Sequence, residues 1–306
     1  MRTTFAARLL AFAALASLVA PGLAAAEKKV LLIAGAPSHG PGHHEHHAGV
    51  RLLEKCLAGQ AGLRTTVFNN AWPAEAELAA AAAIVIYGDG GPKHIALQSE
   101  RLAQLDRVLA RGTGLGLLHY ATEPTLELGQ KEFLRWVGAA FEIHWSVNPH
   151  WDATFSNLPN HPITRGVRPF TLRDEWYFHL RFAEDRRGLT PILSAVPDAS
   201  TMSRPDGHHS GNPAVRAAVA RGEPQTVAWA YERADGGRGF GTTGGHYHSN
   251  WAQDDFRKLV LNAVLWLAKL EVPRDGFVST VTPADLAANL DPKPASKAKA
   301  ADAKKR

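Results

Sequence analysis

The chain has almost no cysteine: Cys56 is the only one among its 306 residues. No intrachain disulfide can form, so a buried core must supply the stability of the fold. Cys56 lies in the stretch GVRLLEKCLAG, in helical step with Leu53 and Leu57, which favours a buried core thiol over a reactive nucleophile.

Long apolar runs are also missing after residue 26, where nothing approaches the roughly 20 residues that a membrane-spanning helix needs. The first 26 residues have the pattern of a secretory signal peptide: Arg2 and Arg8 give a basic start, an apolar core follows, and Ala24-Ala25-Ala26 forms the cleavage signal. We expect cleavage after Ala26 and an exported protein, periplasmic or secreted. No cysteine stands at the cleavage site, so we expect no lipid or membrane anchor.

Excess charge is small, and several cofactor signatures are absent. The formal net charge of +5 falls by two when the signal peptide is removed, and the near-neutral remainder argues against nucleic acid as a partner. No G-x-G-x-x-G follows the first apolar run, and neither G-x-S-x-G nor a P-loop occurs. We therefore expect no nucleotide cofactor and no serine-hydrolase chemistry.

The sequence does contain a regular alternation of apolar runs and amphipathic stretches. The runs at 29–35 (KVLLIAG), 83–87 (AIVIY) and 114–120 (GLGLLHY) are typical of strands buried on both faces of a parallel sheet. Further strands are expected at 63–70, 152–155, 189–194, 226–232 and 238–242. Helices are expected at 74–81, 97–109, 133–140 and 254–270, and one more helix follows the first histidine-rich loop and ends at residue 57. This order predicts an α/β fold with an open, doubly wound, mostly parallel sheet.

The domain boundaries follow from composition. Residues 1–26 are the expected signal peptide, and 27–275 form one large α/β domain. Residues 276–306 form a C-terminal extension with a Lys/Ala/Pro-rich tail, which has little to bury and is expected to be disordered.

Histidines follow several of the expected strands. In an open parallel sheet, ligands bind outside the carboxyl ends of the strands, so the segments 37–47, 89–94 and 119–123 should share one edge. The first contains SHGPGHHEHHAG, which could be a metal site, a substrate-binding edge or a solvated loop. Helical spacing back from Leu53 places His43 and His46 toward the sheet and His44 and His47 away from it, so most of this cluster is expected to be solvated.

Three histidines have spacings or positions that suit a metal. His246 and His248 in GGHYHSNW are two apart, and in an extended segment both project to one face. A hydrogen-bonded surface loop is the alternative reading. With His39 from the first loop they form the expected ligand set for a divalent ion such as zinc, which the spacing permits but does not require.

The expected catalytic residues are His119, Glu123 and Glu175. His119 ends a buried strand, where a sharp turn exposes a side chain at the rim, and Glu123 could orient it. Glu175 stands in Asp-Glu-Trp-Tyr, where only one of the two acids can point into a pocket if the segment is extended. A capped core histidine and a solvated acidic turn are the corresponding structural alternatives.

Acidic and aromatic side chains supply the expected substrate-binding residues. Aromatic rings stack on the apolar face of a sugar while carboxylates bond its hydroxyl groups. The candidates on this basis are Asp89, His144, Trp145, Trp176, Tyr177 and Trp251. A solvated acidic turn next to aromatic residues of the core would give the same sequence pattern, and this alternative stays open.

Taken together, the segments SHGPGHHEHHAG, YGDGG, LHYATE, IHWSVNPHW, DEWYFHLRF, HHSGNPAVR and GRGFGTTGGHYHSNWAQDDFRKLVLNAVLWLA resemble the ThuA-like proteins, named for trehalose utilisation, and within them the secreted branch. The resemblance spans residues 28–273. It implies a flavodoxin-like fold with helices on both faces, related to the class I glutamine amidotransferases. Those enzymes carry a cysteine where this chain has His119, so amidotransferase chemistry is not expected. The resemblance also implies breakdown of disaccharides through keto-sugars.

Two functions remain open at this point. The first is an exported enzyme that hydrolyses, eliminates or isomerises glycosides or keto-sugars by His/Glu acid–base chemistry, with or without a metal. The second is a non-catalytic periplasmic sugar-binding protein. Either would take a carbohydrate as its partner, and a homo-oligomer is compatible with both.

Overall fold

The computed structural model of the protein describes residues 26–293. The expected signal peptide and the last part of the expected tail lie outside the described residues, except for Ala26. Within residues 26–293, no helix is long and apolar enough to cross a membrane.

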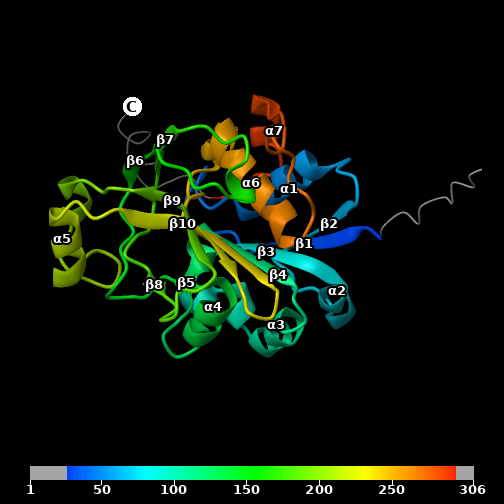
Figure 1. Cartoon of the computed structure of the whole chain (residues 1–306), viewed down its shortest axis with the longest axis horizontal. Coiled ribbons are helices and arrows are strands. Elements are labelled where there is room, and N and C mark those ends of the chain that lie inside the picture. The colour runs from blue at the N-terminus through cyan, green and yellow to red at the C-terminus, as the bar shows by residue number, and fades with distance from the viewer. Residues whose placement is uncertain (1–25, 294–306) are drawn as a thin grey trace, which may run out of the picture.

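A seven-stranded sheet forms the centre of the molecule, with strands in the order β2-β1-β3-β4-β11-β10-β9 (Figure 1). Strands β2, β1, β3, β4 and β11 pair in parallel, and β10 pairs antiparallel with both of its neighbours. The strands are β1 (Lys28–Ala34), β2 (Leu63–Asn69), β3 (Ala81–Tyr87), β4 (Gly114–Leu118), β9 (Leu189–Ala195), β10 (Gln225–Glu232) and β11 (Arg238–Thr242). The expected α/β fold is confirmed, and β1, β3, β4 and β11 deliver their carboxyl ends to one edge.

Helices cover both faces of this sheet, as Figure 1 shows. Alternate residues of β1 explain the two layers: Val30 and Leu32 face one apolar core, while Leu31 and Ile33 face the other. The first core contains α1 (His46–Leu57) and α6 (Asp254–Leu267), and the second contains α2 (Glu75–Ala79), α3 (Arg101–Leu109) and α4 (Gln130–Val137).

Helix α1 lies unusually close to the sheet because it carries a glycine at the contact. A Cβ atom added at Gly49 would lie 2.5 Å from the ring of Tyr87, which is fully buried at the end of β3. The Tyr87 hydroxyl donates a hydrogen bond to the Gly245 carbonyl after β11. This contact ties the start of α1 to the carboxyl edge of the sheet.

The second half adds smaller elements that the sequence placed less well. The expected helix at 133–140 ends at Val137, because Gly138 is left-handed (φ 81°), and Ala139–Ala140 form β5 instead. The expected strand at 152–155 exists as β6 (Trp151–Phe155), but it pairs outside the main sheet with β7 (Phe170–Asp174). The other short elements are β8 (Arg181–Phe182) and α5 (Pro213–Ala220).

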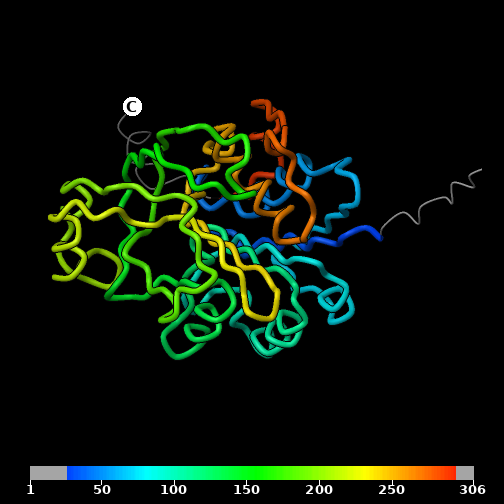
Figure 2. The backbone as a smooth tube through the Cα atoms, in the orientation of Figure 1, coloured from blue at the N-terminus to red at the C-terminus, as the bar shows by residue number. Residues whose placement is uncertain are grey.

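The C-terminal extension packs onto the domain over its described residues, 276–293, and most of the tail that is expected to be disordered lies beyond them. Phe277 is buried in the first core, and α7 (Pro283–Ala287) begins at a capping box between Thr282 and Asp285. Asp285 forms an ion pair with Lys55 of α1. Figure 2 shows this red segment crossing back over the blue N-terminal part of the chain. The tail therefore folds onto the domain at least as far as Lys293.

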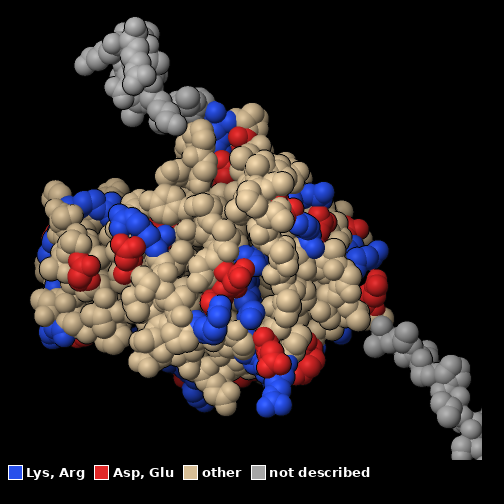
Figure 3. Space-filling model, turned by 90° about the horizontal axis from the view of Figure 1, so that it is seen from above, with Lys and Arg blue, Asp and Glu red and all other residues tan. Residues whose placement is uncertain are grey.

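Charged side chains are interspersed on the surface seen in Figure 3, with no broad area of Lys and Arg. A nucleic-acid groove would require such an area. The face in view therefore offers no such groove.

Candidate functional site

Four side chains meet at the carboxyl edge of the sheet: His44, His119, Glu175 and His246. They come from the loop after β1, the turn after β4, the residue after β7 and the loop after β11. Each offers one ligand atom, and all four atoms lie within 4.8 Å of one another. We call this set the His3Glu cluster.

The distances inside the His3Glu cluster match those between ligands of one metal ion. His44 Nε2 lies 2.9 Å from His246 Nδ1 and 3.1 Å from His119 Nε2. Glu175 Oε2 lies 2.9 Å from His246 Nδ1 and 3.5 Å from His119 Nε2. Four nitrogen and oxygen ligands placed tetrahedrally around zinc stand about 3.3 Å apart. The cluster thus has the size and donor types of a zinc site.

The outer nitrogens of the three histidines are all held. His119 Nδ1 lies 2.7 Å from the Thr243 carbonyl, and His44 Nδ1 lies 3.0 Å from Asp89 Oδ1. His246 Nε2 lies 2.6 Å from His43 Nδ1. Partners of this kind fix the ring orientation and tautomer of metal-ligating histidines.

The assigned tautomers leave lone pairs facing each other. A carbonyl and a carboxylate only accept hydrogen bonds, so His119 and His44 each carry their proton on Nδ1. Their Nε2 lone pairs then converge at 3.1 Å with no proton between them. The Tyr177 hydroxyl lies 3.2 Å from His119 Nε2 and 3.4 Å from Glu175 Oε2, and its one proton can serve only one of them. A cation among the four atoms would satisfy all of their lone pairs at once.

Burial keeps the histidines of the cluster neutral. It lowers the pKa of His44, His119 and His246 below the ordinary value of 6.5. Burial also raises the pKa of Glu175 to about 7. Neutral imidazoles are the form that binds metals, and a cation beside Glu175 would favour its carboxylate form.

Two residues of the His3Glu cluster have strained backbone conformations. His44 has φ 47° and His119 has φ 56°, both in the left-handed region that residues with a Cβ rarely adopt. Such conformations cost about 1–3 kcal/mol each and gather at functional sites. Here they aim the two Nε2 atoms at one point.

The loop that carries His246 is held by a buried carboxylate. Asp174 accepts hydrogen bonds from the backbone N–H groups of Gly245 and His246, at 2.8 and 3.0 Å. It is fully buried, and its neighbour Glu175 points into the cluster instead. Of the two adjacent acids, one positions the loop and the other belongs to the ligand set.

Outside the cluster, His209 and Glu123 form a hydrogen-bonded pair that is connected to it through two aromatic rings. His209 Nε2 lies 3.0 Å from Glu123 Oε1 and 3.2 Å from Oε2. Its ring stacks on Phe141, which in turn contacts Tyr177 beside His119. Burial raises the pKa of Glu123, and the hydrogen bond to Glu123 raises the pKa of His209.

The structure brings together several of the residues expected from the sequence. His119, Glu175 and His246 belong to the cluster, and Tyr177 and Asp89 contact it. Glu123 bonds His209 and not His119, so it does not orient His119 as expected.

Two of the expected metal ligands lie outside the cluster. His39 forms, with His44 and Asp89, a second group that could hold a metal ion, and its ring stacks on that of His44 with 3.6 Å between the ring centroids. His248 is not among the grouped ligand atoms, because its buried ring leaves the extended segment in the short helical turn His248–Ala252. The expected projection of His246 and His248 to one face therefore does not occur.

The expected sugar-binding aromatics are mostly engaged elsewhere. Trp176 and Trp251 are buried in the core against Phe256, so neither ring face is open to a sugar. Trp145 lies beneath the guanidinium of Arg181 at 3.6 Å. His144 is exposed and contacts His208.

Sequence reasoning missed His44, His43 and His209. Helical spacing does not apply to His43 and His44, because α1 begins only at His46 and both residues lie in the preceding loop. The HHEHH pattern gives no sign of that boundary. His209 lies in HHSGNP, where neither spacing nor hydrophobic pattern points to Glu123.

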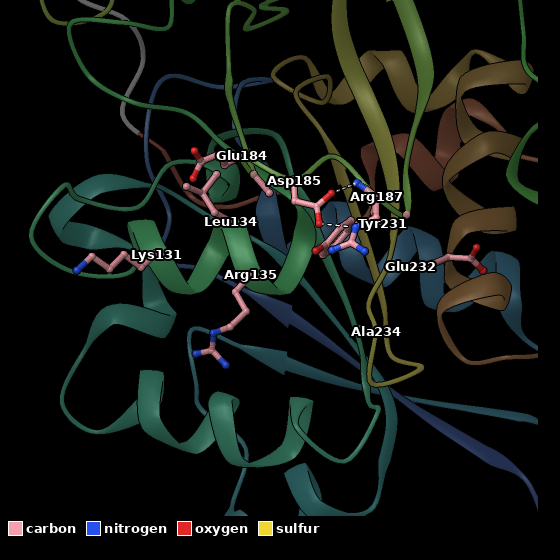
Figure 4. Close-up of a pocket in the computed structure, with 11 residues that line it drawn as sticks. Lys131, Leu134, Arg135, Glu184, Asp185, Arg187, Tyr231, Glu232 and Ala234 are labelled. Atoms are coloured by element: carbon pink, nitrogen blue, oxygen red, sulfur yellow. Dashed lines mark hydrogen bonds and ion pairs between the residues drawn. The ribbon is translucent and has the colours of Figure 1, made fainter.

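One open cavity lies away from the His3Glu cluster. It has a volume of about 580 Å³ and is lined by residues of α4, the loop after β8 and the β10–β11 turn (Figure 4). That turn stands at the amino end of β11, opposite the edge that carries the cluster. The cavity contains an Asp185–Arg187 ion pair but no grouped metal ligands.

Comparison with known proteins identifies the class of this α/β protein. A family model described as ThuA, trehalose utilisation, matches residues 29–267. The chain therefore belongs to the ThuA family. A solved structure of a ThuA-like protein from Bacteroides uniformis ATCC 8492 is similar, with a TM-score of 0.59 and 16% identity, over 81% of this chain and 94% of that one. No curated protein matches the chain.

Proposed function

We propose that the protein is an exported, metal-dependent enzyme that acts on glycosides or keto-sugars. The single observation behind this proposal is the convergence of four metal-ligand atoms whose outer nitrogens are all held by partners. The family description, trehalose utilisation, supports a carbohydrate as the substrate.

The proposed ligands of a divalent ion such as zinc are His44, His119, Glu175 and His246. Three imidazoles and one carboxylate suit zinc, and the outer partners favour a fixed geometry. When bound, such an ion would supply Lewis acidity if one of the four protein ligands gave way to, or made room for, an oxygen of the substrate. The sequence suggests His119 and Glu175 as catalytic residues, whereas on this proposal both bind the metal ion.

Glu123 and His209 are then the proposed acid–base pair. Both pKa values are raised, so the pair retains a proton that the His3Glu histidines do not. A keto-sugar has an acidic hydrogen next to its carbonyl, and removing it allows the neighbouring glycosidic oxygen to leave. The pair can take up the first proton and return one to the departing oxygen.

Export is part of the proposal on the strength of the sequence alone. The basic start, apolar core and A-x-A signal at residues 1–26 carry it. A periplasmic or secreted enzyme would meet oligosaccharides before their uptake.

The test begins with metal content and turnover of the purified protein. Zinc is measured by mass spectrometry, and the protein is then incubated with 3-keto-trehalose while released glucose is followed. We expect about one zinc per chain and glucose release that chelation abolishes. Sugar binding without turnover, in zinc-loaded protein, would favour a non-catalytic binding protein instead.

Three variants separate the proposed roles. His44→Ala should lose both zinc and turnover, whereas Glu123→Gln should keep zinc and lose about 10²- to 10⁴-fold in turnover. His161→Ala, at a histidine that packs on Trp266 away from the cluster, is the matched control and should keep both. Equal zinc content in His44→Ala and His161→Ala would refute the ligand assignment.

A further inference from the structure

The C-terminal extension reaches the loop that carries two of the site histidines. The Lys293 ammonium donates hydrogen bonds to the carbonyls of His43 and His44, the latter at 3.0 Å. It also pairs with Glu45 Oε1 at 3.3 Å, and the side chains of Lys293 and Glu45 are only 3% and 1% exposed. A lysine this well buried has its charge committed to a few fixed partners.

Glu45 connects both sides of this contact. Its Oε1 accepts a hydrogen bond from the Gly42 N–H at 2.8 Å, and its Oε2 accepts one from the Asp291 N–H at 2.9 Å. One buried carboxylate therefore joins the start of the histidine loop to the end of the extension. We call residues 291–293 the C-terminal strap.

The strap is anchored along its approach. Phe277 is buried in the core and its N–H bonds the Asn262 side chain at 2.8 Å. Ser279 receives hydrogen bonds from Arg257 of α6, and Asp285 pairs with Lys55 of α1. Lys293 is thus held in place from several elements of the domain.

We propose that the C-terminal strap, through Lys293, is a positioning element for the metal site. This inference rests on the proposed function in one respect, that the His3Glu cluster binds a metal. Lys293 binds the two carbonyls that flank the left-handed residue His44, and so helps to hold a backbone that a residue with a Cβ disfavours. His44 is a proposed ligand, and His43 holds the outer nitrogen of His246.

The extension is outside the family match, which ends at residue 267. The domain recognised by that match therefore lacks the residues that fix its own histidine loop. On this inference, residues 276–293 are a working part of the site.

The experiment replaces Lys293 in the full-length chain and measures two properties. Lys293→Met removes the ammonium but keeps much of the side-chain volume, and Lys131→Met on the exposed face of α4 is the matched control. Amide hydrogen exchange is followed by mass spectrometry over residues 42–49 and over α6. The zinc dissociation constant is measured by competition with a chromophoric chelator.

We expect Lys293→Met to speed exchange at least tenfold over residues 42–49 while α6 keeps its protection. The zinc dissociation constant should rise about 10- to 100-fold, as it does when the partners of metal ligands are removed. Lys293→Arg should restore most of both properties. In Lys293→Met the buried carboxylate of Glu45 loses its ion-pair partner, and this could destabilise the whole protein. The double variant Glu45→Gln/Lys293→Met removes that unpaired charge and is compared in the same way.

The two proposals fail differently. Wild-type protein that binds no zinc would refute the metal centre, and exchange over residues 42–49 would then decide on the strap alone. Exchange within twofold of the wild type in Lys293→Met overturns the strap whatever happens to zinc, because the strap acts through the main chain of that loop.

Discussion

Replacing His94 should change how the stability of the protein depends on pH. His94 is fully buried in the loop after β3. Its Nε2–H donates to the Ala121 carbonyl at 3.0 Å, and its Nδ1 accepts from the Ala96 N–H at 3.0 Å. A second ring proton would point at that N–H, so both the hydrogen bonds and the burial favour the neutral ring.

The size of the effect follows from the pKa. Burial lowers the pKa of His94 from 6.5 to about 4. A group with a lowered pKa in the folded state takes up a proton more readily when unfolded, so its contribution is complete above pH 6.5 and declines as the pH falls toward 4. The linkage relation gives a loss of about 2 kcal/mol between pH 7.5 and pH 5.0 from this one residue.

The assay is urea unfolding of the wild type and His94→Gln at pH 7.5 and 5.0, in the presence of a chelator. Other buried histidines titrate in both proteins, so their contributions cancel in the comparison. The variant should be less stable at pH 7.5 but should lose about 2 kcal/mol less on acidification. Parallel losses in the two proteins would show that His94 is not held neutral by its surroundings, and would refute the reasoning.

Two further predictions concern the positions of the ligands. Asp89→Asn replaces the charged partner of His44 Nδ1 and should weaken zinc binding about 10- to 100-fold in a chelator competition, with unchanged affinity contradicting the role of Asp89. Gly49→Ala places a methyl group 2.5 Å from the Tyr87 ring and should lower the free energy of unfolding by about 1–3 kcal/mol. Gly40→Ala, where no atom lies within 4 Å of the added carbon, is the control in thermal unfolding, and equal stability of the two variants would contradict the packing argument.

The sheet could be predicted from the sequence because buried parallel strands are recorded as continuous apolar runs. The runs at 29–35, 83–87 and 114–120 became β1, β3 and β4 within one or two residues. The edge that carries the site followed from their common direction. The sequence does not predict that β6 pairs with β7 outside the main sheet, since its apolar pattern would be the same if it paired with a strand of the main sheet.

The site was harder to predict than the fold because loops have no period. Helical spacing predicts that His44 points away from the sheet, but this spacing does not apply before His46, where the helix begins. Trp176 and Tyr177 stand side by side in the sequence, but one ring is in the core and the hydroxyl of the other reaches His119. Alternation separates the two faces of an extended segment without saying which is the pocket.

One local sequence pattern predicts a helix in the C-terminal extension. Thr282 and Asp285 are spaced as a capping box, and Pro283 stands at the first helical position. The Lys/Ala/Pro-rich composition that predicts disorder begins only at about residue 291. The contact of Lys293 with Glu45 has no counterpart in local sequence, because 248 positions separate the two residues.

The four donor atoms of the His3Glu cluster come from connections that are remote along the chain: His44 and His119 are 75 positions apart, and His44 and His246 are 202 positions apart. An unfolded chain would have to close these loops before it could hold an ion at all four positions, so the proposed zinc would bind the native state far more tightly than the unfolded one. On that proposal, raising free zinc should shift the melting temperature upward, and withdrawing it should loosen the edge of the sheet where the four connections meet.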